Sequence, residues 1–137
     1  MAVARVREAG RTHSQLFFSV DKMTGLTTTN SLATVFSTSG DAWCDMSSCV
    51  HITFVIHNTH ASNVLKYSVL GTYDPSIAKG EWVNLTTRAY GSDRTVAADT
   101  EVTETMSPNE FRYYDVQIAA NVADSQATVT VEVRGIG

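Results

Sequence analysis

The feature that most constrains the fold of this chain is an alternation of apolar and polar residues with a period of two. In residues 51–57, Ile52, Phe54 and Ile56 alternate with more polar neighbours. Successive side chains of a β-strand point to opposite faces of its sheet, so this pattern predicts a strand with one buried face. Three further stretches alternate in the same way and are predicted as strands: residues 64–73, 111–119 and 127–133.

Turn-forming residues separate these stretches. Residues 58–63 are polar, so the strands on either side are expected to form an antiparallel hairpin with a loose loop. After Gly80 a short strand is predicted around Trp82, Val83 and Leu85, and the polar residues 86–93 are predicted as a loop.

The remaining stretches alternate less regularly. Residues 95–106 carry Glu101 and Glu104, which indicates an exposed edge strand. Residues 15–20 and 32–39 are candidate strands separated by a Thr-rich loop at 22–30. No segment of helical length shows the spacing of an amphipathic helix.

Seven or eight short strands with turns between them need two facing sheets or a closed barrel to cover their apolar faces. The sequence therefore predicts an all-β chain folded as an antiparallel β-sandwich, either jelly-roll-like or Ig-like. A chain of 137 residues without repeats or linkers fits one domain. We assign residues 13–137 to this domain and residues 1–12 to a flexible, basic N-terminal arm.

The charge balance disfavours nucleic-acid binding, because the formal net charge is −4 and the isoelectric point is about 5.4. Only 18% of the residues are charged, so Thr and Ser must supply much of the polar surface. The arm is the exception, because it contains three basic residues, Arg5, Arg7 and Arg11, and a single acidic residue, Glu8. Two interpretations stay open, an arm that docks on an acidic partner and a terminus without function.

No stretch is long and apolar enough to span a bilayer, and the N-terminus lacks the apolar core of a secretion signal. We therefore expect no membrane association and synthesis in a cytoplasm. Cys44 and Cys49 are expected to be thiols there, although a disulfide after release into an oxidising medium stays open.

The polar residues form no recognisable catalytic or metal-binding motif. His51 and His57 would stand about 20 Å apart along one strand, too far for one metal, and His60 is interpreted as an ordinary turn residue. Asp115 could serve as one carboxylate of a glycosidase pair, but nothing identifies a second. The sequence also lacks nucleophile-elbow and phosphate-loop motifs. We expect a protein that is not an enzyme and that needs no cofactor.

Aromatic residues suggest an alternative binding role. Trp82, Tyr67 and Tyr114 belong to alternating strands and are expected in the core. Tyr73 and Tyr90 fall in predicted loops, so they are the candidates for stacking on a sugar.

Four stretches carry a resemblance to a known group of proteins: VLKYSVLGTYDP at 64–75, EWVNL at 81–85, FRYYDVQI at 111–118 and the terminal VTVEVRG. This pattern, over residues 50–137, resembles small β-sandwich structural proteins of tailed-phage virions, closest to capsid decoration or cement proteins. The resemblance implies a virion protein made in the host cytoplasm and located on the capsid surface. It also implies homotrimers that bind the major capsid protein and stabilise the shell by bridging its subunits.

Two functions therefore compete at this point. In the first, the chain coats a capsid and Arg5, Arg7 and Arg11 contact the shell. In the second, it is a carbohydrate- or receptor-binding sandwich of a tail or other virion appendage, and Tyr73 and Tyr90 contact the ligand.

Overall fold

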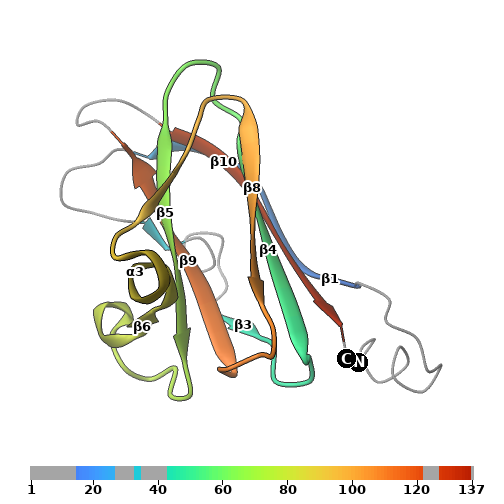
Figure 1. The fold of residues 1–137 in the computed structure, drawn as a ribbon. Helices are drawn as coiled ribbons and strands as arrows, with labels where there is room; N and C mark the ends of the chain where they lie inside the picture. The colour runs from blue at the N-terminus through green and yellow to red at the C-terminus, as the bar shows by residue number, and fades with distance from the viewer. Residues whose placement is uncertain (1–14, 27–32, 35–42, 122–126, 137) are drawn as a thin grey trace.

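The structure, a computed structural model, describes residues 15–26, 33–34, 43–121 and 127–136. It confirms the predicted fold class, because these residues form two antiparallel sheets that face each other (Figure 1). The basic arm, including Arg5, Arg7 and Arg11, lies outside the described residues.

The first sheet contains four strands in the order β1-β10-β4-β8. All of its neighbouring strands are antiparallel. Strand β1 continues past the predicted residues 15–20 into the predicted loop. The bounds are β1(Gln15–Leu26), β10(Ala127–Ile136), β4(His51–Asn58) and β8(Thr100–Met106).

The second sheet is centred on two long strands that pair with each other, β5 and β9. Two short strands, β2 and β3, flank β9, and two others, β6 and β7, flank β5. If each flanking pair counts as one interrupted strand, the two sheets hold eight strand positions, in agreement with the predicted seven or eight. The bounds are β2(Ala33–Thr34), β3(Cys44–Asp45), β5(Leu65–Thr72), β6(Val83–Asn84), β7(Arg94–Val96) and β9(Tyr113–Ala120).

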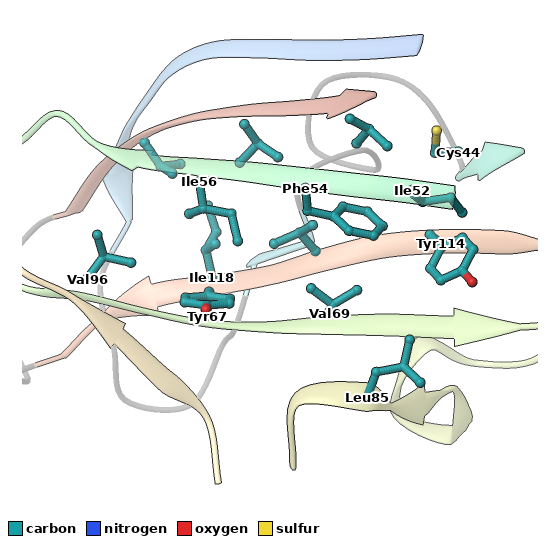
Figure 2. Packing of buried hydrophobic residues seen from close by; sticks show 14 of the residues in the cluster. Cys44, Ile52, Phe54, Ile56, Tyr67, Val69, Leu85, Val96, Tyr114 and Ile118 are labelled. Carbon is teal, nitrogen blue, oxygen red and sulfur yellow. The ribbon is translucent and has the colours of Figure 1, made fainter. Parts of the chain in front are cut away.

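The core lies between the sheets and is built from the predicted alternating residues. Ile52, Phe54 and Ile56 of β4 are fully buried, and Tyr67 and Tyr114 reach the same layer from the opposite sheet (Figure 2). The rings of Phe54 and Tyr114 lie 5.5 Å apart across the gap between the sheets. Burial of such side chains, about 25 cal/mol per Å² of apolar area, is the main force that holds the sheets together.

The predicted hairpin of residues 51–57 and 64–73 is wrong, because the two strands belong to different sheets. Strand β4 pairs with β10 and β8, whereas β5 pairs with β9 and the short strands beside it. The connection is shaped by the buried Asn58, whose side-chain amide donates to the carbonyl oxygens of Asn63 and Val96. These bonds fix an arch between the sheets in place of the predicted hairpin loop.

The predicted loop at residues 86–93 is also partly wrong, because a short helix, α3(Leu85–Tyr90), occupies most of it. Residues 95–106 form two strands, one in each sheet, where a single edge strand was predicted. Strand β8 does lie at the edge of its sheet, and Glu101 is exposed as expected. Glu104, in contrast, is only 6% exposed because its side chain points inward.

Candidate binding groove between helix α3 and strand β8

Helix α3 forms because both of its ends are capped by local residues. The side chain of Asn84 accepts a hydrogen bond from the backbone of Thr87 at 2.8 Å, which satisfies a free donor of the first turn. Gly91 ends the helix with a φ of 83°, a left-handed conformation that glycine adopts without strain, and its N–H donates to the Thr87 carbonyl at 2.7 Å. Leu85 anchors the helix by burying its side chain in the core.

The helix interrupts the edge of the second sheet at the point where β6 ends and β7 has not yet begun. A side chain takes over the missing strand contact there, because Thr86 Oγ1 accepts a hydrogen bond from Val69 N of β5 at 2.9 Å. Both residues are buried, so this bond satisfies a donor that water cannot reach. The buried N–H of Val69 therefore keeps a hydrogen-bond partner where the helix interrupts the sheet edge.

A groove runs between α3 and β8, along the side of the sandwich where the edges of the two sheets lie opposite each other. Its volume is about 380 Å³, within the range of small-ligand sites. The helix forms one wall, and four consecutive residues of β8 form the other. The lining residues are Leu85, Thr86, Arg88, Ala89, Tyr90, Thr103, Glu104, Thr105 and Met106.

A buried carboxylate lies in the groove. Glu104 accepts a hydrogen bond from Arg94 Nη1 at 3.2 Å, and the Tyr90 hydroxyl lies 3.4 Å from the same carboxylate oxygen. The Arg94 guanidinium also covers one face of the Tyr90 ring, 4.4 Å from its centroid. Arg94 and Tyr90 are largely exposed, so they shield an acidic group that the fold has turned inward.

Tyr67 lies beneath this cluster, and its hydroxyl oxygen is buried without a hydrogen-bond partner. Burial raises the pKa of the phenol to about 12, and the neighbouring carboxylate of Glu104 adds to this effect. The phenol therefore stays neutral over the physiological pH range.

The far end of the helix is tied to the loop that follows β8. Arg88 forms two hydrogen bonds with the carboxylate of Glu110, and this pairing lowers the pKa of the carboxyl group. The Tyr73 hydroxyl donates to the backbone carbonyl of the same Glu110, while its ring packs on Phe111 at 5.0 Å. Both predicted stacking tyrosines thus border one unit made of α3 and the loop around Glu110.

A second cluster lies where β3 pairs with β9. Trp43, 38% exposed, meets the Tyr113 ring edge-on at 5.6 Å, and the Arg112 guanidinium lies 5.0 Å from the centroid of that ring. Arg112 also pairs with Asp45 at 3.2 Å. Burial disfavours the charged carboxylate, but hydrogen bonds from Ser47 and Arg112 outweigh it, so the pKa of Asp45 is lowered. We call Trp43, Tyr113, Arg112 and Asp45 the Trp43 patch.

The two tyrosines predicted to bind a ligand lie in different surroundings in the structure. Tyr73 is 68% exposed and Tyr90 is 55% exposed, so both are accessible as expected. Tyr90 is a groove residue at the end of α3, and not a loop residue, whereas Tyr73 contacts Phe111 and does not line the groove. The two rings have different neighbours, since Tyr73 packs on Phe111 and the Arg94 guanidinium covers one face of Tyr90.

The other residues weighed from the sequence have structural contacts. His60 Nδ1 accepts from the backbone N–H groups of Ser62 and Asn63, which organises the arch between β4 and β5. Within the described residues, no group of three histidine, cysteine or acidic side chains could hold a metal. Cys44 and Cys49 are buried thiols, and Cys44 donates to the sulfur of Met46.

Asp115 has a basic partner in the structure. Its fully buried carboxylate pairs with Lys79, whose ammonium group also lies 4.3 Å from the centroid of the Trp82 ring. Trp82, Tyr67 and Tyr114 are buried, as predicted.

Sequence reasoning missed the groove because it treated residues 86–93 as a loop. A usable signal was present, since Asn84 and Gly91 bracket six residues in the way that an N-cap and a C-terminal glycine bracket a short helix. The roles of Arg94 and Glu104 depend on contacts between strands far apart in the sequence, which no local pattern indicates.

The sequence matches no known protein family and no curated protein. In the described part of the chain, no helix is long and apolar enough to cross a membrane.

Proposed function

We propose that the chain is a non-enzymatic structural protein of a phage virion, which binds the outer capsid surface and stabilises the shell by bridging neighbouring capsid subunits. The resemblance of residues 50–137 to decoration proteins motivates this role. The observation that supports it best is the Trp43 patch, because tryptophan, tyrosine and arginine are the residues that contribute most binding energy at protein interfaces. The major capsid protein is the proposed partner, and a homotrimer is the proposed assembly.

The proposal is tested first by copy number. Quantitative mass spectrometry of purified virus particles that carry the gene should give a copy number close to that of the major capsid protein, as expected for a protein that coats the shell. A few copies per particle would move the protein to the tail or connector. Its absence from particles would refute the virion role.

Two variants test which surface contacts the shell. Trp43→Ala should weaken binding to capsids that lack the protein, because it removes the aromatic anchor of the patch. Deleting residues 1–10, which removes Arg5 and Arg7 and keeps Arg11, should also weaken binding if the basic arm contacts an acidic shell. Tyr73→Ala is a suitable control, since it removes an exposed aromatic residue outside both surfaces.

A second candidate function is carbohydrate or receptor binding, which the groove beside Tyr90 favours. The groove offers an aromatic ring, threonine hydroxyls and the carboxylate of Glu104, which together match the mixed character of a sugar hydroxyl face. Binding on a glycan array that is lost in Tyr90→Ala but kept in Tyr73→Ala would support this function. An array without binding would count against it.

A further inference from the structure

The outer edge of β8 is unpaired within the part of the chain that the structure describes. Strand β8 pairs with β4 on one side, and among the described residues no strand pairs with it on the other. Its sequence, TEVTETM, contains neither lysine nor proline, the residues that commonly keep an exposed edge from pairing.

The hydrogen-bond pattern identifies which residues offer this edge. Thr59 N donates to Thr128 O, which continues the β4–β10 ladder and assigns the odd-numbered residues of β4 to bonds with β10. The even-numbered residues of β4 therefore bond with β8, where their partners are also even-numbered. It follows that the backbone N–H and C=O groups of Glu101, Thr103 and Thr105 point outward in the plane of the sheet, to the side opposite β4.

The chain contains one stretch with the right pattern to fill this edge. Residues 2–8, AVARVRE, alternate so that Ala2, Ala4 and Val6 share one face of an extended chain with the last residue, Glu8, while Arg5 and Arg7 share the other face with Val3. This stretch lies outside the described residues. Its pattern matches a strand that is mainly apolar on one side and mainly basic on the other.

The two faces of this stretch fit the two sides of β8. The small apolar side chains would point into the groove, where Leu85 and Met106 form part of the lining. Arg5 and Arg7 would then lie on the solvent side, where β8 exposes Glu101. Opposite charges on neighbouring strands attract each other, and the backbone hydrogen bonds supply the rest of the affinity.

Geometry favours delivery of the stretch by a second copy. A strand added to β8 would lie four strand spacings from β1, about 19 Å, while residues 9–14 can bridge about 24 Å when fully extended. That leaves little length for passing around the loop after β8. We propose that residues 2–8 of one copy add to the β8 edge of another copy, so that exchanged arms hold the protein in an oligomer. This inference goes beyond the proposed shell-coating role, and it assigns Arg5 and Arg7 to Glu101 of another copy instead of to the shell.

The test is the oligomeric state of the full chain, measured by sedimentation equilibrium without any capsid protein. The wild-type chain should self-associate, and deletion of residues 2–8 should give a monomer. A wild-type chain that stays monomeric at high concentration, or an oligomer that survives the deletion, would overturn the proposal.

Two matched variants of β8 test the edge itself. Thr103→Pro removes an outward N–H and should weaken self-association at least about tenfold, because proline at an exposed edge blocks the pairing of another strand. Thr103→Val keeps the N–H and should weaken self-association far less than Thr103→Pro does. Far-UV circular dichroism must show that both variants are folded, and equal association of the two folded variants would refute the pairing.

A charge exchange tests the assignment of residues. Arg5→Glu together with Arg7→Glu should weaken self-association, and Glu101→Arg in the same chain should restore part of it. A labelled peptide with the sequence of residues 1–11 should bind the arm-deleted chain and fail to bind its Thr103→Pro variant. Absence of rescue and of peptide binding would contradict the docking at β8, while the copy number in virus particles would still decide the proposed function separately.

Discussion

The two strand edges that lie on the groove side of the sandwich differ in how far other residues cover them. In one sheet, the edge of β5 is covered along its length by β6, by Thr86 of α3 and by β7. In the other sheet, the edge of β8 has no such cover among the described residues. This contrast among the described residues is the basis of the proposal that β8 binds another strand. Breaking the cover at β5 should therefore cost stability, while changes at β8 should affect only association.

The largest expected effect comes from Gly71 on the covered edge. A Cβ atom at this position would lie 2.8 Å from the ring of Phe111 and 3.3 Å from Leu85, so Gly71→Ala forces the Phe111 ring to shift and crowds the Leu85 side chain. Overpacking of this kind typically costs about 1–3 kcal/mol. Urea unfolding should show this loss, whereas Gly80→Ala, where a Cβ meets nothing within 4 Å, should change the free energy of unfolding little.

The second prediction compares one threonine on each edge. Thr86→Val removes the acceptor for the buried Val69 N–H and should destabilise the fold by about 1–3 kcal/mol. Thr103→Val makes the same chemical change on the exposed face of β8 and should shift stability by less than about 0.5 kcal/mol. Equal losses in the two variants would show that the edges do not differ in the way described.

The sequence predicted the fold better than it predicted the groove. Alternation identified β4, β5, β9 and β10, because a period of two is visible locally. In β4 this period matches one buried face, whereas β5 and β9 are buried on most of both faces. Alternation did not identify which strands pair. The arch after β4 depends on Asn58 bonding to Val96, 38 residues away, and such a contact leaves no trace in the local pattern.

The groove was hidden for a related reason. Glu104 was interpreted as a solvent-facing residue because glutamate is rarely buried. Its burial depends on Arg94, which comes from a strand of the other sheet. The helix could have been predicted from its two capping residues, but the inward direction of Glu104 on the strand opposite it could not.

The third prediction concerns the capping of α3, which holds the cover over β5. Asn84→Ala removes the side chain that accepts from Thr87 N and should cost about 1 kcal/mol. Asn84→Asp keeps an acceptor and should retain most of the stability. Both can be compared by thermal unfolding. A loss in the alanine variant that is matched by the aspartate variant would mean that the cap does not stabilise the helix.

The smallest effect at neutral pH is expected at Tyr67, between the two edges. Tyr67→Phe removes a buried hydroxyl that has no hydrogen-bond partner, so stability at pH 7 should be unchanged or slightly increased. The difference should appear in alkali. The folded-state pKa of about 12 is above the ordinary value of 10, so the neutral phenol stabilises the fold fully below pH 10 and this contribution is lost as the pH rises through 12.

Urea unfolding of both chains at several pH values between about 9 and 12 measures this contribution. The wild-type chain should lose up to about 2–3 kcal/mol more than Tyr67→Phe over that range, since one pKa unit corresponds to about 1.4 kcal/mol. Tyr114, whose pKa is also raised by burial, is present in both chains and cancels in the difference. Parallel pH profiles would mean that the Tyr67 hydroxyl is hydrated in solution. Water would then enter the sandwich from the β8 side, and the contrast between the two edges would extend into the core.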